Sequence, residues 1–298
     1  MAALTAPLDG ALKAIAGRAG DDGAFAPRPG AAGTSDATAW AVMALSAAHA
    51  EPERVARARA RLVAMQGTDG RVSADPANPQ AWWVTPLAVL AWYGAKEQEE
   101  AQLRAVAFLE REGGKSSERG NKPIGHDPSI PGWSWIEGSA SMVEPTALGL
   151  LALRRCGESG HPRAKDAVRL LLDRQLPSGG WNYGNTVIYD RVLLPQVDAS
   201  GVALLALAGL VARAQVEGSI GYLRAELARV RAPLSLGFGL LALRAWGEKP
   251  ADAAAWIDEA SRRQEQRGGY GTPLLGLLVL AALEDAGVAR LVDLEVPK

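Results

Sequence analysis

Residues 144–156 read Glu144-Pro-Thr-Ala-Leu-Gly-Leu-Leu-Ala-Leu-Arg-Arg-Cys156, and this stretch decides the fold. Its alanines and leucines leave almost no charge before the last turn, so a helix formed here is apolar on every side and has to be buried. Similar stretches recur along the chain and are predicted as inner helices together with it. They are Asp36–His49, Thr85–Gly94, Asp198–Arg213, Pro233–Trp246 and Pro273–Ala286.

A second kind of segment alternates with the first and carries one charged face. Such amphipathic helices cover a buried layer from outside. The predicted outer helices are Leu4–Ala19, Glu53–Gln66, Glu97–Glu112, Arg163–Gln175, Val216–Val230 and Asp252–Gln266. Strict alternation of the two kinds predicts six outer–inner helical hairpins.

The alanines of the recurring Leu-Ala-Leu motif give the repeat its spacing. They stand 47, 61, 54, 36 and 39 residues apart, at Ala44, Ala91, Ala152, Ala206, Ala242 and Ala281. A period of this kind indicates a repeat architecture, either an open solenoid or a closed ring. The inner helices are nearly free of charge, whereas a solenoid would expose one of their faces. We therefore expect an all-α fold, an (α/α)6 toroid, as a single domain over residues 1–298.

The bulk composition narrows the function classes. The chain has 298 residues, 48% hydrophobic and 22% charged, with a net charge of −1, so no strong field attracts nucleic acid. Cys156 is the only cysteine, which fits a reducing compartment. No signal peptide and no apolar run of about 20 residues is seen. A cytoplasmic location is expected, while contact with a membrane surface is left open.

The loops between helices are of two lengths. Connections from an outer to the next inner helix are long, as in Gly20–Ser35, Gly67–Trp82, Gly113–Met142 and Leu176–Val197. All of them therefore lie at one end of the ring, around the N-termini of the inner helices. Functional residues concentrate on long loops held by a rigid scaffold. We expect the functional site at this long-loop end.

Three outer-to-inner turns share a pattern of glutamine, three residues, glycine, one residue and a larger side chain. They run from Gln66 to Val72, from Gln175 to Trp181 and from Gln264 to Tyr270, and Asp22-Gly-Ala-Phe25 is a partial copy. The pattern resembles the glutamine–tryptophan repeat of squalene–hopene cyclases, within the superfamily of terpenoid cyclases and protein prenyltransferase β subunits. The resemblance implies the toroid and gives these residues a structural role, as ties between helices.

The stretch Gln196-Val-Asp198-Ala-Ser200-Gly-Val-Ala203 is similar to the acid motif of that family, Asp-x-Asp-Asp-Thr-Ala. The resemblance implies that Asp198 is the proton donor, although Gln196 and Ala199 replace the flanking aspartates. Asp36 and Glu144 stand at the corresponding place in two other repeats. The three carboxyl groups form a predicted catalytic cluster with a raised pKa. The alternative is that each carboxylate only stabilises a helix N-terminus.

Aromatic residues gather near the same end and are candidate ligand-binding residues, because aromatic faces stabilise a carbocation. They are Trp40, Trp83, Trp133, Trp135, Trp181, Tyr183, Tyr189 and Tyr270. The alternative is that they pack the ring. Trp133 and Trp135 flank a loop segment and are the favoured cavity residues.

A metal or cofactor is not expected. Prenyltransferase β subunits bind zinc through an Asp-x-Cys pair and a later histidine, and the matching place here has Ser200 instead of cysteine. His49, His126 and His161 do not fall at the start of an inner helix, so the ligands that zinc needs are missing.

Two hypotheses of function follow. In the first, the toroid binds an apolar, isoprenoid-like ligand in its central cavity, with acid-initiated cyclisation by Asp198. In the second, it is a non-catalytic module that binds a protein, peptide or lipid partner at the long-loop end. Whether the protein is an enzyme, its ligand and its oligomeric state are left open.

Overall fold

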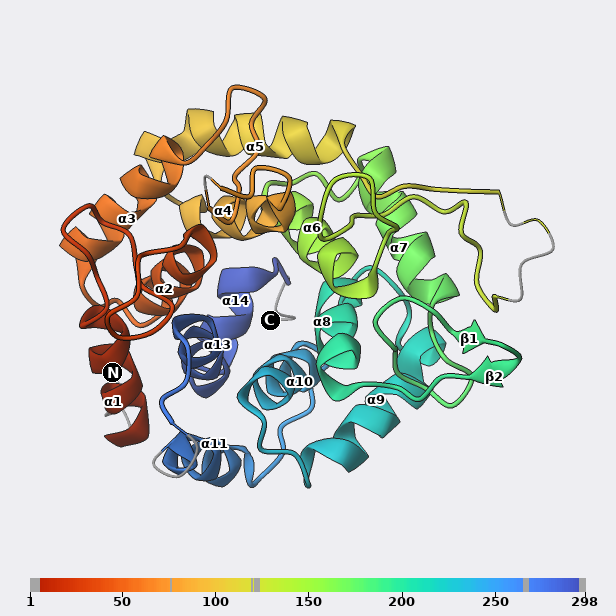
Figure 1. The fold of residues 1–298 in the computed structure, drawn as a ribbon. Helices are drawn as coiled ribbons and strands as arrows, with labels where there is room; N and C mark the ends of the chain where they lie inside the picture. Colours follow the sequence, from red (N-terminus) through yellow and green to blue (C-terminus); the bar gives the residue numbers. More distant parts are fainter. Residues whose placement is uncertain (1–5, 76, 119, 121–123, 265–267, 295–298) are drawn as a thin grey trace.

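The computed structural model describes residues 6–75, 77–118, 120, 124–264 and 268–294, and its helices form a ring of two layers (Figure 1). The inner layer consists of α2 (Ser35–Ala47), α4 (Thr85–Trp92), α6 (Val143–Arg155), α8 (Val197–Leu207), α10 (Pro233–Ala245) and α13 (Thr272–Ala282). The outer layer consists of α1 (Ala6–Ala16), α3 (Pro52–Ala64), α5 (Glu99–Arg111), α7 (Pro162–Asp173), α9 (Arg213–Leu227) and α11 (Ala253–Arg262). Within the described residues, no helix is both long enough and apolar enough to cross a bilayer.

The ring is closed, which confirms the predicted (α/α)6 toroid. Each inner helix packs against the next one along the chain, and α13 packs against α2. Each outer helix contacts the two inner helices beside it, and α1 lies between α13 and α2 (Figure 1). Thr272 fastens this seam, because its hydroxyl donates to the carbonyl of Ala26 over 2.6 Å and its amide donates to the carbonyl of Pro27 over 2.9 Å. Leu4, Thr5 and residues 265–266 of the predicted outer helices lie outside the described residues.

One hydrogen bond recurs where four of the long loops meet the next inner helix. A threonine or serine hydroxyl in the first turn of the helix accepts the backbone N–H of a buried loop residue. The pairs are Thr38 with Phe25 at 2.9 Å, Thr85 with Val72 at 3.0 Å, Thr146 with Trp133 at 3.0 Å, and Ser200 with Trp181 at 2.9 Å. The repeated hydroxyl thus fixes the long loops over the inner-helix N-termini.

Short elements interrupt the loops. Two 3-10 turns, η1 (Trp82–Val84) and η2 (Lys96–Gln98), precede α4 and α5. Strands β1 (Val187–Ile188) and β2 (Arg191–Val192) pair antiparallel as a small hairpin that projects from the ring (Figure 1).

The end of the last inner helix differs from the prediction. A single helix was expected up to Ala286, but α13 ends at Ala282 and a separate helix, α14, spans Asp285–Leu291. Helix α14 contacts α2, α6, α10 and α13, and Gly287 packs so closely that an added Cβ would lie 1.8 Å from the Leu280 carbonyl oxygen. The periodicity missed this break because both helices are apolar toward the ring.

Helix α14 lies at the end of the ring opposite the long loops. Its Arg290 donates hydrogen bonds to the carbonyls of Leu90, Ala91 and Tyr93, at the C-terminal end of α4. The long loops meet the N-terminal ends of the inner helices. The toroid is therefore covered by α14 at one end, and its interior is approached from the other.

Candidate functional site

A pocket of about 140 Å³ opens among the N-terminal ends of the inner helices. Two layers of side chains form most of it. The upper layer, from the first turns, is Asp36, Trp83, Glu144 and Leu234, and the lower layer, four residues further along each helix, is Trp40, Leu87, Leu148 and Phe238. Residues four apart lie on one helix face, so α2, α6 and α10 each contribute one side chain to each layer, while Trp83 of η1 and Leu87 of α4 form the fourth pair. Leu274 and Leu277 complete the wall from α13.

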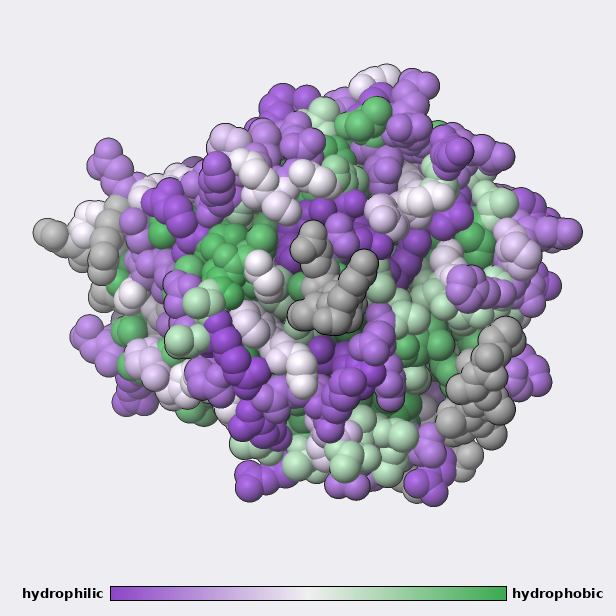
Figure 2. Space-filling view, turned by 180° about the vertical axis from the view of Figure 1, so that it is seen from behind, coloured by the Kyte–Doolittle hydropathy of each residue, from purple (hydrophilic) through white to green (hydrophobic). Residues whose placement is uncertain are grey.

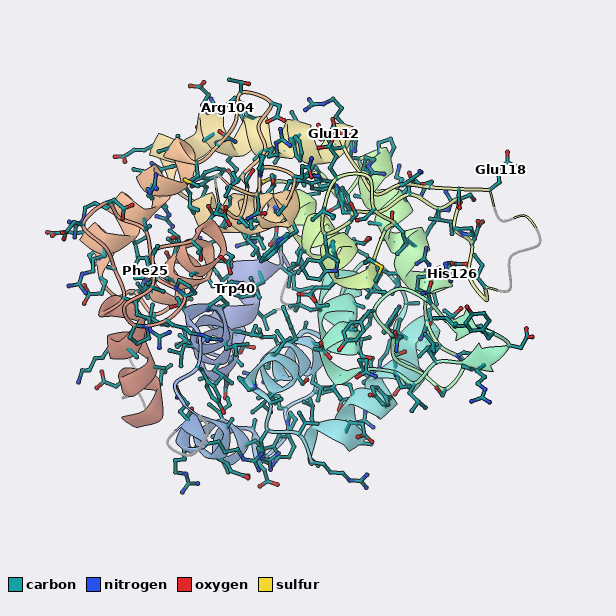
Figure 3. The ribbon with its side chains drawn as sticks, in the orientation of Figure 1. Phe25, Trp40, Arg104, Glu112, Glu118 and His126 are labelled. Atoms are coloured by element: carbon teal, nitrogen blue, oxygen red, sulfur yellow. The ribbon has the colours of Figure 1, made fainter. Side chains whose placement is uncertain are left out.

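Aromatic rings make up much of the pocket lining. Trp40 meets Phe238 edge to face, with ring centroids 6.0 Å apart. Trp83 meets Trp135 in the same way at 5.5 Å. Trp135 comes from the loop between α5 and α6, which is held over the mouth by the amide of Glu137 donating to the carbonyl of Gln80. Figure 3 shows Trp40 toward the middle of the ring, while Arg104 and Glu112 lie on its outer rim.

The structure brings the three predicted carboxyl groups to the same end of the ring. Asp36 and Glu144 line the pocket together. Asp198 does not line it but lies close enough to act on Glu144 electrostatically. Burial, and then the charge of Asp198, raise the pKa of Glu144 to about 7. A carboxyl group with this pKa is about half protonated at neutral pH, so Glu144 can serve as a general acid there.

The pocket encloses the three predicted acids to different degrees. The resemblance gave the proton to Asp198, yet the pocket encloses Glu144, which carries the raised pKa. Burial, and then the neighbouring Asp198, raise the pKa of the Tyr183 phenol. Tyr183 is itself 47% exposed. Asp198 thus lies at the rim, between the pocket acid and a half-exposed tyrosine.

Trp133 and Trp181 are walls of the ring and do not reach the pocket. Both are buried, and each indole N–H donates to a helix carbonyl, from Trp133 to Leu109 at 3.1 Å and from Trp181 to Leu171 at 2.6 Å. The guanidinium of Arg163 also stacks 4.6 Å above the Trp133 ring. These contacts make both tryptophans wedges between outer and inner helices.

Two further aromatic candidates also lie away from the pocket. The hydroxyl of Tyr270 donates to the carbonyl of Ala260 on α11, over 2.7 Å. Tyr189 is 84% exposed at the tip of the β1–β2 hairpin. Of the eight aromatic candidates, Trp40, Trp83 and Trp135 line the pocket, and Tyr183 borders it through Asp198.

Two glutamines of the repeated turn connect neighbouring outer helices, whereas the third, Gln264, donates to the carbonyl of Ser261 in its own helix. The side chain of Gln66 donates to the carbonyl of Ala101 on α5, over 2.8 Å. That of Gln175 donates to the Ser219 hydroxyl on α9, over 2.7 Å, and the same hydroxyl accepts the amide of Gly180. These contacts have the form of ties between helices.

Several pocket residues were missed by the sequence reasoning: Leu87, Leu148, Leu234, Phe238, Pro273, Leu274 and Leu277. The recurring hydroxyl residue could have been used to locate pocket residues from the sequence. Residues two positions before Thr38, Thr85 and Thr146 all line the pocket, so Trp83 occupies the place that Asp36 and Glu144 hold in their repeats. Within the residues that the structure describes, no group of three histidine, cysteine or acidic side chains is arranged to hold a metal ion.

Comparisons with known proteins give the fold a context. No protein-family model and no curated protein matches the chain. Among solved structures, an α-amylase from Clostridium perfringens is 10% identical, with a TM-score of 0.62 over 94% of this chain and 98% of that one. A type II terpene cyclase from Scytonema, in complex with geranylgeranyl dihydroxybenzoate, is 12% identical, with a TM-score of 0.58 over 96% of this chain and 98% of that one.

The ent-copalyl diphosphate synthase from Streptomyces platensis is also similar, with 17% identity and a TM-score of 0.54 over 86% of this chain and 50% of that one. The chain therefore has a terpenoid cyclase-like fold, as the sequence motifs predicted. At these identities the likeness shows the fold alone. An α-amylase with the same architecture illustrates that the toroid does not fix the chemistry.

Proposed function

We propose that the pocket at the long-loop end binds one end of an apolar, isoprenoid-like molecule, with Glu144 as an acid facing it. The observation that carries the proposal is a pocket in which Trp40, Trp83 and Trp135 surround a carboxyl group with a pKa of about 7. A type II terpene cyclase of the same fold binds a geranylgeranyl compound. The chemistry of the lining, and not the likeness, selects the ligand class here.

The pocket volume limits how much of a ligand is enclosed. A dry cavity of about 150 Å³ accommodates a benzene ring, so the 140 Å³ pocket takes about one isoprene unit. The rest of a longer chain would extend toward the loops. Exposed apolar side chains are available there, because Tyr183, Val192 and Leu194 are 47%, 55% and 77% exposed. Long-chain ligands should therefore gain contacts outside the ring.

The same geometry supports acid-initiated cyclisation as the reaction. The Glu144 carboxyl group would transfer its proton to a carbon of a double bond or to an epoxide oxygen, leaving a carboxylate and a cation. The faces of Trp40, Trp83 and Phe238 would stabilise that cation. Asp198 would act through Glu144, since its charge helps to keep the proton on the neighbouring carboxyl group until the ligand is bound.

Binding is tested by filling the pocket. Leu234 lines the pocket on α10 and is only partly buried, so Leu234→Trp should block the pocket with the ring intact. Equilibrium dialysis with farnesol should show binding to the natural protein and a loss of at least about tenfold in the variant. Leu103→Trp, at a position 62% exposed on α5, is the matched control and should bind normally. Equal binding by both variants would overturn the proposal.

Catalysis is tested separately, with farnesol and its terminal epoxide as substrates and mass spectrometry of the products. Glu144→Gln keeps the shape of the side chain but cannot donate the proton, so product should disappear while farnesol still binds. Asp198→Asn should change the pH at which product forms. If the natural protein binds farnesol but forms no product, the non-catalytic function is the correct one, which the small enclosed volume also favours.

A further inference from the structure

A second cavity lies at the opposite end of the ring, where α2, α3, the residues after α4, and α14 come together. It measures about 430 Å³, and its lining includes Leu45, Pro52, Val55, Arg59, Tyr93 and Arg290. Figure 2 shows this end of the molecule, where hydrophilic and hydrophobic residues alternate over the face. None of the pocket residues of the proposed function takes part in it.

Three guanidinium groups gather around the C-terminal end of α4, beside this cavity. Arg155 stacks 3.8 Å above the Tyr93 ring, and Arg290 lies 5.9 Å from the same ring. Arg59 reaches in from α3, and its Nε donates to the carbonyl of Ala91 over 3.0 Å. The cluster thus assembles from an outer helix, the end of α6 and helix α14.

The positive charges of this cluster are poorly compensated. Arg155 pairs with Asp293 at 3.5 Å, but that aspartate side chain is 75% exposed. Over residues 6–294, apart from the undescribed positions, no carboxylate pairs with Arg59 or Arg290. Burial, and then the neighbouring Arg59 and Arg155, lower the pKa of Arg290 to about 10. Like charges held together in this way favour a bound anion.

Capping of helix α4 does not account for the whole cluster. Arg290 already donates to the carbonyls of Leu90, Ala91 and Tyr93. Arg59 donates through Nε to the Ala91 carbonyl, over 3.0 Å, and through one terminal nitrogen to the Ser46 hydroxyl, over 3.3 Å. In addition, the Nε atoms of Arg155 and Arg290 are buried without a hydrogen-bond partner. Donors are therefore left over in the cluster.

We propose that this cavity is a binding site for a phosphate-type anion, the phosphate or diphosphate group of a small organic molecule. The planar guanidinium matches a phosphoryl group through paired N–H donors. Arg59 and Arg290 line the cavity and bind the anion, while Arg155 adds positive charge from behind Tyr93. The cavity also has an apolar side, formed by Leu45, Pro52 and Val55, which suits the organic part of the ligand.

The test is calorimetric titration of the full chain with sodium pyrophosphate, inorganic phosphate and acetate, at one ionic strength set with sodium chloride. Pyrophosphate should bind more tightly than phosphate, and acetate should not bind measurably. Arg59→Gln should weaken pyrophosphate binding by at least about tenfold. Arg57→Gln, an exposed arginine two residues away on α3, is the matched control and should leave binding unchanged.

A second measurement needs no variant. The Nε–H signals of Arg155 and Arg290 in a ¹⁵N NMR spectrum should shift on addition of pyrophosphate, because the anion enters their surroundings. Equal affinity for pyrophosphate in the two variants, tight binding of acetate, or Nε–H signals that stay in place would each overturn the assignment. These readouts do not involve the pocket at the long-loop end, so the two proposals stand or fall separately.

Discussion

Replacing Glu144 with glutamine should make the stability of the protein less sensitive to pH. In the folded chain the pKa of Glu144 is raised from 4.5 to about 7 by burial and by Asp198. The folded state therefore keeps a proton that the unfolded chain releases as the pH rises through 4.5. Stability is lost over this interval, and the loss levels off once the pH exceeds the folded value.

The shift from 4.5 to about 7 sets the magnitude. At about 1.4 kcal/mol for each pKa unit, the full loss is about 3.5 kcal/mol, of which about 2.5 kcal/mol falls between pH 5 and pH 8. Glutamine has no proton to lose, so Glu144→Gln removes this component. The measured quantity is the free energy of unfolding of the variant minus that of the natural protein. This difference should be about 2.5 kcal/mol larger at pH 8 than at pH 5.

Urea unfolding followed by tryptophan fluorescence at the two pH values measures the difference directly. The control is Glu53→Gln, which replaces an exposed glutamate in the first turn of outer helix α3. Its stability relative to the natural protein should be the same at both pH values. If Glu144→Gln behaves like this control, Glu144 titrates as an ordinary carboxyl group, and the argument for an enclosed acid fails.

Three further variants test the packing. Trp133→Phe loses the hydrogen bond to the Leu109 carbonyl and should lower the free energy of unfolding by about 1–3 kcal/mol. Farnesol binding should stay the same, and weaker binding would place Trp133 in the binding site. Thr146→Val leaves the buried Trp133 amide without its acceptor and should lower the free energy of unfolding in urea by about 1–3 kcal/mol. An unchanged free energy of unfolding would mean that the amide has found another acceptor. Gly287→Ala places a Cβ against the Leu280 carbonyl and should cost about 2 kcal/mol and speed hydrogen exchange in α14, whereas unchanged exchange would contradict the close packing.

The ring could be predicted because the sequence pattern that indicates it occurs six times. The apolar stretch at Glu144–Cys156 is ambiguous alone, but six such stretches alternating with charged-faced segments leave few arrangements that bury them all. The placement of the long loops at one end followed from connectivity. For the same reason Asp36 and Glu144 could be assigned to one mouth before their side chains were located.

The pocket itself could be predicted only in part. Burial depends on which neighbour covers a side chain, and the sequence gives no measure of that. Trp133 and Trp135 stand two residues apart on one loop, yet one is a buried wedge and the other lines the pocket. The sequence pointed to Asp198 rather than Glu144 for the same reason, since motif alignment ranks carboxyl groups by position and not by enclosure in a pocket.

The seam at which α1 lies between α13 and α2 also governs how the protein comes apart. An open array of helical pairs frays, because its terminal pairs have one neighbour each and melt first. Here the first and last helical pairs contact each other, with Thr272 hydrogen-bonded across the contact, so no terminal pair is left with a single neighbour from which unfolding could begin. Melting any pair breaks two interfaces at once, and the toroid is lost as a whole.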